Sequence, residues 1–270
     1  MKFNNHNSLL DQRAVDHLRN RLDHSASVNL PIYTEITDRL LERVDIIRIQ
    51  PKTILNIGWL PQSAIDKLQK KYPDAIIHSK QTSDDIKNDS YDLVIAHFSL
   101  LYEPDPLVFL FRISQALHDE GLLLFASLGP DTLMELRHSF AHIDAHPHVH
   151  TFTDMHDIGD WMQQLHFSDP VMDREEIVLA YEQLALLFDD LKKIGARNVL
   201  QTRSRGLLSK NKWNSMLRQY GEHKKEDYFP VTLEILYGHG WKRKKDNEEF
   251  LSHEVCVPID KIEITKRVRP

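Results

Sequence analysis

Cysteine is nearly absent from this chain, and so are long apolar runs. Cys256 is the single cysteine in 270 residues, which excludes an internal disulfide and favours a reducing compartment. The longest apolar runs, such as residues 122–126, fall far short of the roughly 20 residues that a membrane-spanning helix needs. Residues 1–22 lack the apolar core of a secretory signal. We therefore expect a cytoplasmic protein with no membrane partner.

An excess of positive charge is missing as well. The formal net charge is −6, and charged residues make up 27% of the chain against 41% hydrophobic residues. This balance is ordinary for a globular protein, and it argues against a mainly electrostatic nucleic-acid binder. The length suits one large domain with enough apolar side chains for a substantial core.

Strand and helix patterns alternate along the first half of the chain. Short apolar runs predict strands over residues 53–58, 75–78, 91–96 and 122–126. Helical spacing predicts helices over residues 9–22, 31–47, 61–71 and 104–117. This order is typical of an α/β fold with a doubly wound, mostly parallel Rossmann-like sheet.

The second half mixes longer strands with helices. We expect helices over residues 130–141, 154–165 and 181–194, strands over 170–180 and 231–238, and a basic helical stretch over 192–225. The domain prediction is N-terminal helices over 1–50, a main domain over 51–242 with a helical lid insertion at about 181–229, and a tail over 243–270. A strand-like segment, Val255 to Ile259, lies in that tail.

Several motifs in the second half resemble one enzyme family. They are GPDTLMELR (129–137), PHVHTFTDMHDIGDWM (147–162), FSDPVMD (167–173) and PVTLEILYGHGWK (230–242). The chain resembles class I S-adenosylmethionine (SAM) methyltransferases and, more narrowly, the malonyl-acyl-carrier-protein O-methyltransferases of biotin biosynthesis. The mitochondrial arginine hydroxylase that assists complex I assembly is similar too. The resemblance implies methyl transfer from SAM to a malonyl carboxylate on an acyl-carrier protein or acyl thioester.

The turn after the first strand departs from the family pattern. Class I sites place a glycine-rich turn there, because glycines let the backbone approach SAM closely. Here Gly58 is the only glycine before Gly121, and Trp59 follows it directly. The resemblance makes Asn56, Gly58, Trp59 and His97 the candidate cofactor-binding residues. A plain turn at the end of the strand also explains Gly58.

Two further parts of the family's cofactor site are missing. A carboxylate normally follows the second strand and accepts the ribose hydroxyls, but residues 77–80 contain none, and Asp84 and Asp85 fall in the next loop. The path from Thr53 to Tyr91 is also too short for the usual strands and helices. We infer that one βα unit is missing. The cofactor motif is degenerate, so the cofactor is SAM if the protein is active, or none.

A run of basic residues in the insertion supplies candidate substrate contacts. Arginine can hold a carboxylate through two parallel hydrogen bonds, and Arg203 and Arg205 precede a glycine in a loop-like segment. We expect these two to bind the malonyl carboxylate or an acidic carrier protein. A solvated helix face would explain the same run.

Histidines cluster between His138 and His156. Neutral imidazoles bind metals, but no cysteine or paired acid completes a tetrahedral set, so we expect no metal site.

Three functions follow from these patterns. The first is a SAM-dependent carboxyl O-methyltransferase acting on malonyl-acyl-carrier protein. The second is a degenerate paralogue that no longer binds SAM and acts as a binding or accessory protein. The third is a hydroxylase or assembly factor. Because a carboxylate is already nucleophilic, the first activity needs no catalytic base, and the sequence offers no catalytic residue that would decide whether the protein is an active enzyme.

Overall fold

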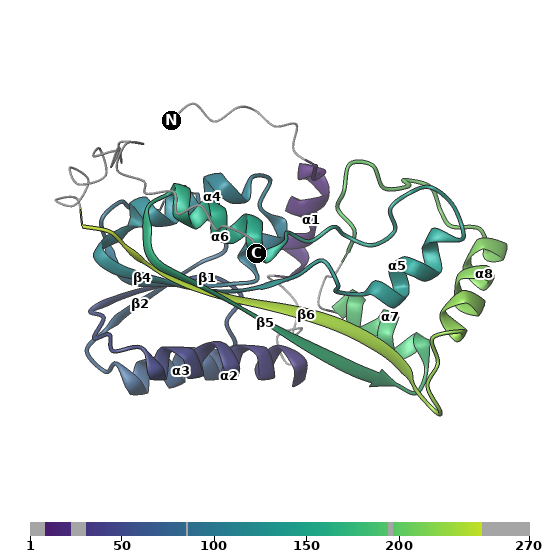
Figure 1. Cartoon of the computed structure of the whole chain (residues 1–270), viewed down its shortest axis with the longest axis horizontal. Helices are drawn as coiled ribbons and strands as arrows, with labels where there is room; N and C mark the ends of the chain where they lie inside the picture. The colour runs from purple at the N-terminus through teal and green to yellow at the C-terminus, as the bar shows by residue number, and fades with distance from the viewer. Residues whose placement is uncertain (1–8, 23–30, 85, 194–196, 245–270) are drawn as a thin grey trace, which may run out of the picture.

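A computed structural model describes residues 9–22, 31–84, 86–193 and 197–244 (Figure 1). The strands are β1 (Thr53–Gly58), β2 (Ile76–Lys80), β3 (Tyr91–His97), β4 (Leu117–Leu128), β5 (Phe167–Tyr181) and β6 (Phe229–Lys242). The helices are α1 (Gln12–Leu22), α2 (Pro31–Ile46), α3 (Gln62–Lys71), α4 (Pro106–Ala116), α5 (Met134–Ala141), α6 (Met155–Gln164), α7 (Leu184–Lys193) and α8 (Lys210–Gly221), with a short 3-10 helix, η2 (Ser99–Tyr102).

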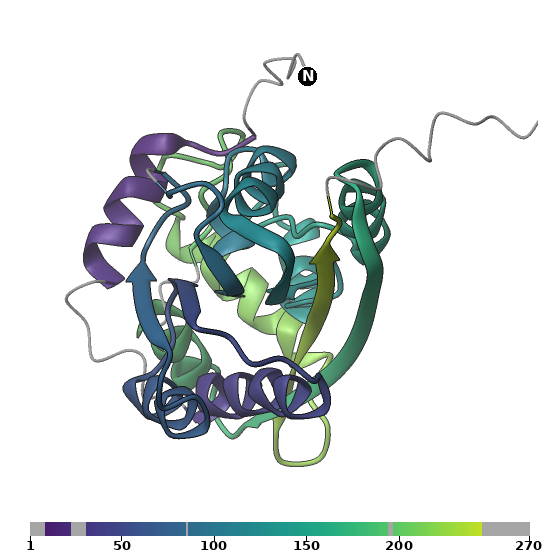
Figure 2. The ribbon, with the colours of Figure 1, turned by 90° about the vertical axis from the view of Figure 1, so that its left-hand side faces the viewer.

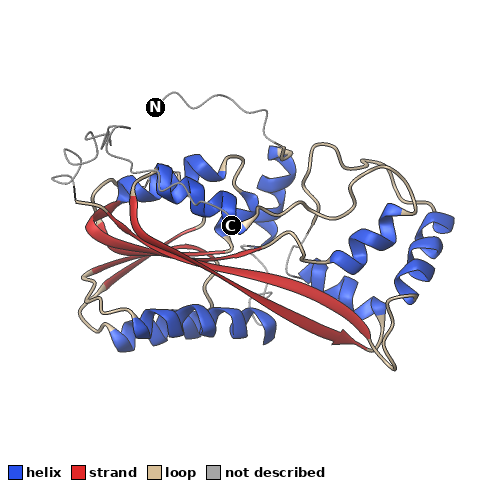
Figure 3. Cartoon of the chain, viewed as in Figure 1, coloured by secondary structure: helices blue, strands red, loops and turns tan. Residues whose placement is uncertain are grey.

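The strands form one sheet in the order β2-β1-β3-β4-β6-β5. Strands β2, β1, β3 and β4 are parallel, and β6 runs antiparallel to both β4 and β5. Helices cover both faces, with α2 and α3 below the sheet and α4 and α6 above it (Figure 3). The prediction of a doubly wound, mostly parallel sheet is confirmed.

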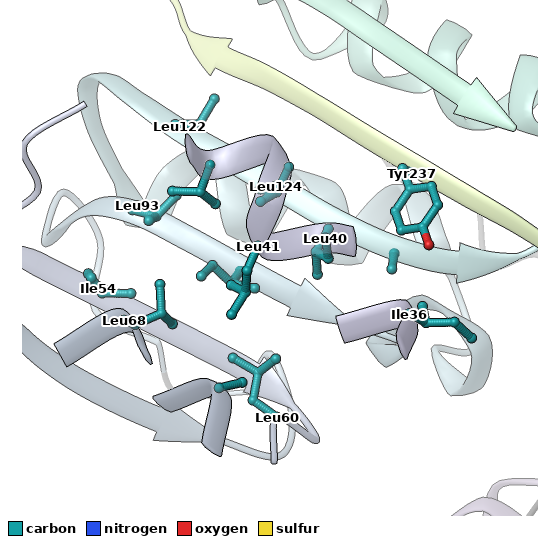
Figure 4. Packing of buried hydrophobic residues seen from close by; sticks show 14 of the residues in the cluster. Ile36, Leu40, Leu41, Ile54, Leu60, Leu68, Leu93, Leu122, Leu124 and Tyr237 are labelled. Atoms are coloured by element: carbon teal, nitrogen blue, oxygen red, sulfur yellow. The ribbon is translucent and has the colours of Figure 1, made fainter. Parts of the chain in front are cut away.

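Alternating side chains divide the buried interior between the two faces. Ile54, Leu93 and Leu124 point toward α2 and α3, while their neighbours Leu55 and Val94 pack with α4 and α6, as the period of two in a strand requires. Figure 4 shows Ile36, Leu40 and Leu41 of α2 lying over the strand residues. This spacing along α2 buries one stripe of the helix, which is what the sequence predicts.

The missing βα unit is confirmed. Strand β2 lies at the edge of the sheet, and the described residues between Lys80 and Tyr91 contain no helix and no strand. The chain therefore crosses from β2 to β3 by a loop alone. Seen from the end of the sheet, no other strand of the described residues lies beyond β2 at this edge (Figure 2).

The second half extends well beyond the parallel strands. Strands β5 and β6 form a long antiparallel pair, and α5, α7 and α8 surround its outer end (Figure 1). These helices share their own apolar cluster with β6, whose buried members include Leu136, Leu187, Tyr220 and Val231. The predicted helical insertion between β5 and β6 is confirmed.

The prediction of a basic helical stretch over 192–225 is wrong for the described residues between Lys193 and Lys210. Helix α7 ends at Lys193, and α8 begins only at Lys210. Between them, residues 199–201 bond to the chain ahead of α1: the amide of Asp11 donates to Val199 O at 2.7 Å, and the amide of Gln201 donates to Leu9 O at 2.8 Å. A backbone group paired in this way is unavailable for a helix. The tail segment 255–259 lies outside the described residues.

Candidate functional site

The turn after β1 lies against the end of β3. Gly58 has a φ of +91°, and a Cβ placed on it would lie 2.4 Å from the carbonyl oxygen of His97. Only glycine meets both demands. Leu60, two residues on, packs into the core below the sheet. The backbone at the end of β3 therefore leaves no room for a side chain at residue 58.

His97 connects three parts of the structure from the same position. Its ring is fully buried, with Nδ1 3.0 Å from Trp59 O and Nε2 3.2 Å from Thr37 Oγ1 on α2. Burial lowers its pKa to about 4, so the ring is neutral at pH 7. Nδ1 then carries the hydrogen and donates to Trp59 O, while Nε2 lies beside the Thr37 hydroxyl, which itself donates to Tyr33 O at 2.6 Å.

Two buried oxygens nearby have no partner. Asn56 donates weakly from Nδ2 to Ser79 Oγ at 3.4 Å, but its Oδ1 makes no hydrogen bond, and neither does the Oγ of Ser99. Trp59 is half-buried. Of the four residues predicted to contact the cofactor, Gly58 and His97 are thus packed against each other, whereas Asn56 keeps a free acceptor.

The end of β2 offers no carboxylate. It ends with Ser79 and Lys80, and Asp84 in the following loop forms an ion pair with Arg112 at 2.6 Å. Asp85 lies outside the described residues. The edge of the sheet where a ribose is normally held therefore lacks the group that would hold it.

A cavity of about 640 Å³ opens beside this position, over the carboxyl ends of β3 and β4. That volume is within the usual range for small-molecule sites. Its lining includes four acidic residues and no lysine or arginine: Glu103, Asp105, Asp154 and Asp157. Asp105 and Asp154 also cap α4 and α6 by accepting backbone hydrogen bonds. This charge favours a cationic ligand.

The cavity wall also carries neutral polar groups. Ser127, at the end of β4, is 2% exposed, lines the cavity, and its hydroxyl bonds to no described residue. His150 donates from Nε2 to Leu101 O at 3.2 Å, and its Nδ1 has no partner. Burial lowers the pKa of His150, so the ring stays neutral and Nδ1 is an acceptor.

The sequence identified none of these cavity residues as a site. Asp154 is recognisable only as a helix cap, because it precedes an apolar helical pattern. Glu103 and Asp105 flank Pro104 in a segment that reads simply as a helix start. The one available signal was their position after the strand at 91–96, since ligands bind beyond the carboxyl ends of parallel strands.

Both arginines predicted to bind substrate lie beside Asp11. Arg203 donates from Nη1 to Leu200 O at 2.7 Å and from Nη2 to Asp11 Oδ2 at 2.8 Å. Arg205 approaches the same carboxylate at 3.6 Å, but its side chain is 72% exposed. The hydrogen bond from Arg203 is the main cause of the lowered pKa of Asp11. Arg205 is therefore the one whose guanidinium stays largely open to a partner.

The clustered histidines make separate contacts. His148 lies 2.8 Å from Asp144 and stacks on Phe140, and His156 lies 2.7 Å from Asp154. The described part of the chain contains no group of three or more His, Cys, Asp or Glu residues able to hold a metal ion. Within that same part, no helix is long and apolar enough to cross a membrane.

Comparison with known proteins decides the family. No family model matches the sequence. A malonyl-acyl-carrier-protein O-methyltransferase 1 of Coxiella burnetii is 38% identical over 247 residues, which covers 84% of this chain and 87% of that protein. The chain belongs to the malonyl-acyl-carrier-protein O-methyltransferase family.

Other members of this methyltransferase family align over similar lengths. The Gallionella capsiferriformans protein is 32% identical and covers 87% of this chain and 92% of its own length. The Legionella pneumophila protein is 31% identical, with 86% and 90% covered. These alignments include the α/β core and the helical insertion alike, so the family assignment applies to the whole described fold.

Two solved structures are similar to this chain at low sequence identity. The YcgJ protein of Bacillus subtilis has a TM-score of 0.48 and 9% identity, covering 77% of this chain and 99% of that one. The Haemonchus contortus phosphoethanolamine N-methyltransferase 2, solved with S-adenosyl-L-methionine, has a TM-score of 0.44 and 10% identity, covering 78% and 53%.

Proposed function

We propose that this protein transfers a methyl group from SAM to the free carboxylate of a malonyl thioester held by an acyl-carrier protein. The observation that supports this most is the 38% identity to a protein of that name over 84% of the chain. The cavity at the carboxyl ends of β3 and β4 supports it independently, because its acidic lining suits a cationic donor.

The residues present fit SAM in the cavity better than over the turn after β1. When bound, SAM supplies an electrophilic methyl group on a positively charged sulfur. Asp105 and Asp157 would face that charge, and Ser127 and His150 would offer hydrogen-bonding groups to the polar part of the molecule. Asn56 and Trp59 do not line this cavity; they stay candidates for contact with a SAM molecule that extends over the end of β1, because Asn56 Oδ1 is unpaired and Trp59 is half-buried.

The chain's own contribution to the reaction is positioning and exclusion of water. A carboxylate is already nucleophilic, so the reaction needs no base. Apolar residues Leu100, Leu101 and Trp161 line the same cavity, and a water-poor site favours a reaction in which a negative and a positive charge disappear together. The exposed guanidinium of Arg205 on the insertion loop supports a contact with an acidic carrier protein.

Intact-protein mass spectrometry tests this proposal. Malonyl-acyl-carrier protein incubated with SAM and the full chain should gain the mass of one methylene group, whereas acetyl-acyl-carrier protein, which has no free carboxylate, should gain none. Arg205→Glu should weaken carrier-protein binding about threefold, while Lys70→Glu on α3 should leave it unchanged. No methylation, together with no calorimetric heat at millimolar SAM, would instead identify an accessory paralogue.

A further inference from the structure

A second, smaller pocket lies on the other side of the contact between α1 and the insertion loop. Its volume is about 360 Å³. One side is a single face of α1, formed by Arg13, Ala14, His17 and Leu18, and the rest comes from the loop before α8 and from Asp11: Arg197, Asn198, Val199 and Arg203. Three arginines and a histidine therefore surround one pocket with a single acid.

The acid is already neutralised. Asp11 accepts from Arg203 at 2.8 Å and from the amide of Ala14 at 3.4 Å, and these interactions hold its pKa below the usual value. Arg13 and Arg197 are exposed, and within the part of the chain that the structure describes neither has an ion-pair partner. The pocket thus keeps the uncompensated positive charges of Arg13 and Arg197, while Arg203 is held in place by its hydrogen bonds to Leu200 and Asp11.

The two cavities share a wall made by one backbone contact. Leu10 and Leu200 form an isolated antiparallel bridge, and both side chains line the acidic cavity. The adjacent Asp11 and Val199 line the basic pocket. A ligand extending past this bridge would have one end in an anion-binding pocket and the other in a cation-binding cavity.

We propose that the basic pocket binds the phosphate group of the thioester arm that presents the acyl substrate. Arginine guanidinium groups bind phosphate oxygens through paired, charge-assisted hydrogen bonds, and two unpaired arginines beside a neutralised aspartate provide that chemistry. The identification of the arm rests on the proposed function; the binding of a phosphate-type anion rests on the pocket alone. An anchored phosphate would hold the acyl end near the shared wall and the acidic cavity.

Calorimetric titration of the full chain with matched probes tests the inference. Pantetheine 4′-phosphate should bind about tenfold more tightly than pantetheine, since charge-assisted hydrogen bonds to the phosphate are lost in the second probe. The double variant Arg13→Gln with Arg197→Gln should remove that tenfold difference. Lys70→Gln, an exposed cation on α3, is the matched control and should preserve it.

Two results would overturn the proposal. Equal affinity for pantetheine and its phosphate would show that the pocket is not a phosphate site. Equal affinity for inorganic phosphate and pantetheine 4′-phosphate would assign the pocket to a free anion and not to the arm. Because no SAM is present, a failure of methyl transfer with intact phosphate preference would count against the proposed function alone.

Discussion

The carboxyl ends of the strands are tightly packed in one part of the sheet and border a cavity in the neighbouring part. At β1 and β3, Gly58 and His97 pack against each other, and the histidine ring fixes Trp59 and α2 in place. At β3 and β4, one strand further along, the ends open into a cavity of about 640 Å³ with acidic walls. The carboxyl edge of the sheet is therefore tightly packed at β1 and β3 and hollowed beside the end of β4.

In the tightly packed part at β1 and β3, we expect the largest loss of stability from a substitution at Gly58. Gly58→Ala should destabilise the protein by about 3 kcal/mol, because the new Cβ would overlap the carbonyl of His97 and the residue would keep a positive φ. Urea unfolding measures the change. Gly206→Ala, where a Cβ meets nothing within 4 Å, should cost far less. Similar losses for both variants would contradict the tight packing of β1 on β3.

The stability of the tightly packed part should also depend on pH through His97. Burial lowers the pKa of His97 to about 4, whereas an unfolded histidine titrates near ~6.5. As pH falls, the unfolded chain binds the proton first, so this ring's contribution is complete above the unfolded value and is lost between pH ~6.5 and about 4. The loss amounts to about 3 kcal/mol across that window.

Denaturant melts across this pH range test the effect. His97→Gln should lower stability at pH 7 and flatten the dependence on pH, while His146→Gln, at an exposed position, should reproduce the wild-type curve. The buried His150 and the half-buried His239, whose pKa values are also lowered by desolvation, contribute in the same direction and remain in both variants. An unchanged slope in His97→Gln would show that this ring is not the main titrating group.

For the cavity at the ends of β3 and β4, we expect a smaller effect, on the affinity for SAM. Asp157→Asn removes one acid from the cavity wall and should weaken SAM binding about threefold, since a partly exposed charge contributes little more. Asp160→Asn lies on the same helix but does not line the cavity, and it should have no effect. Calorimetry with SAM gives both values. Equal behaviour of the two variants would remove the acidic cavity as the donor site.

Most of the fold follows from the sequence because local patterns determine it. The buried strands at 53–58 and 91–96 and the helix from Pro31 are visible as apolar runs and helical spacing. The strand predicted over 122–126 in fact begins at Leu117 and contains a bulge, because Leu117 and Leu122 pair with β3 residues only two positions apart. The loop at 197–209 lies in the stretch that was predicted to be helical. Its backbone partners lie near residue 10, far away in sequence, so no local pattern reveals them.

The site was less predictable than the fold for a physical reason. Missing glycines and a missing carboxylate are visible in a sequence, so the degenerate cofactor motif around Gly58 could be inferred from the sequence alone. The closure itself depends on a carbonyl of β3 and a ring that bonds to α2, which no local pattern records. The acidic cavity joins residues 103–106 to residues 150–157, and only the completed sheet brings these segments together.

The long β5–β6 pair has a mechanical consequence. Its 15 and 14 residues extend from the central sheet into the helical insertion, and the pairing is regular from Val171 to Tyr181 after a bulge at the inner end. Leu233 packs against the clusters of both regions. The insertion therefore has no loop hinge at this junction, and any swing of α7 and α8 must bend a hydrogen-bonded ribbon. Slow amide exchange along β6 should report such bending, and the stiffness of that ribbon would set how fast the insertion can move.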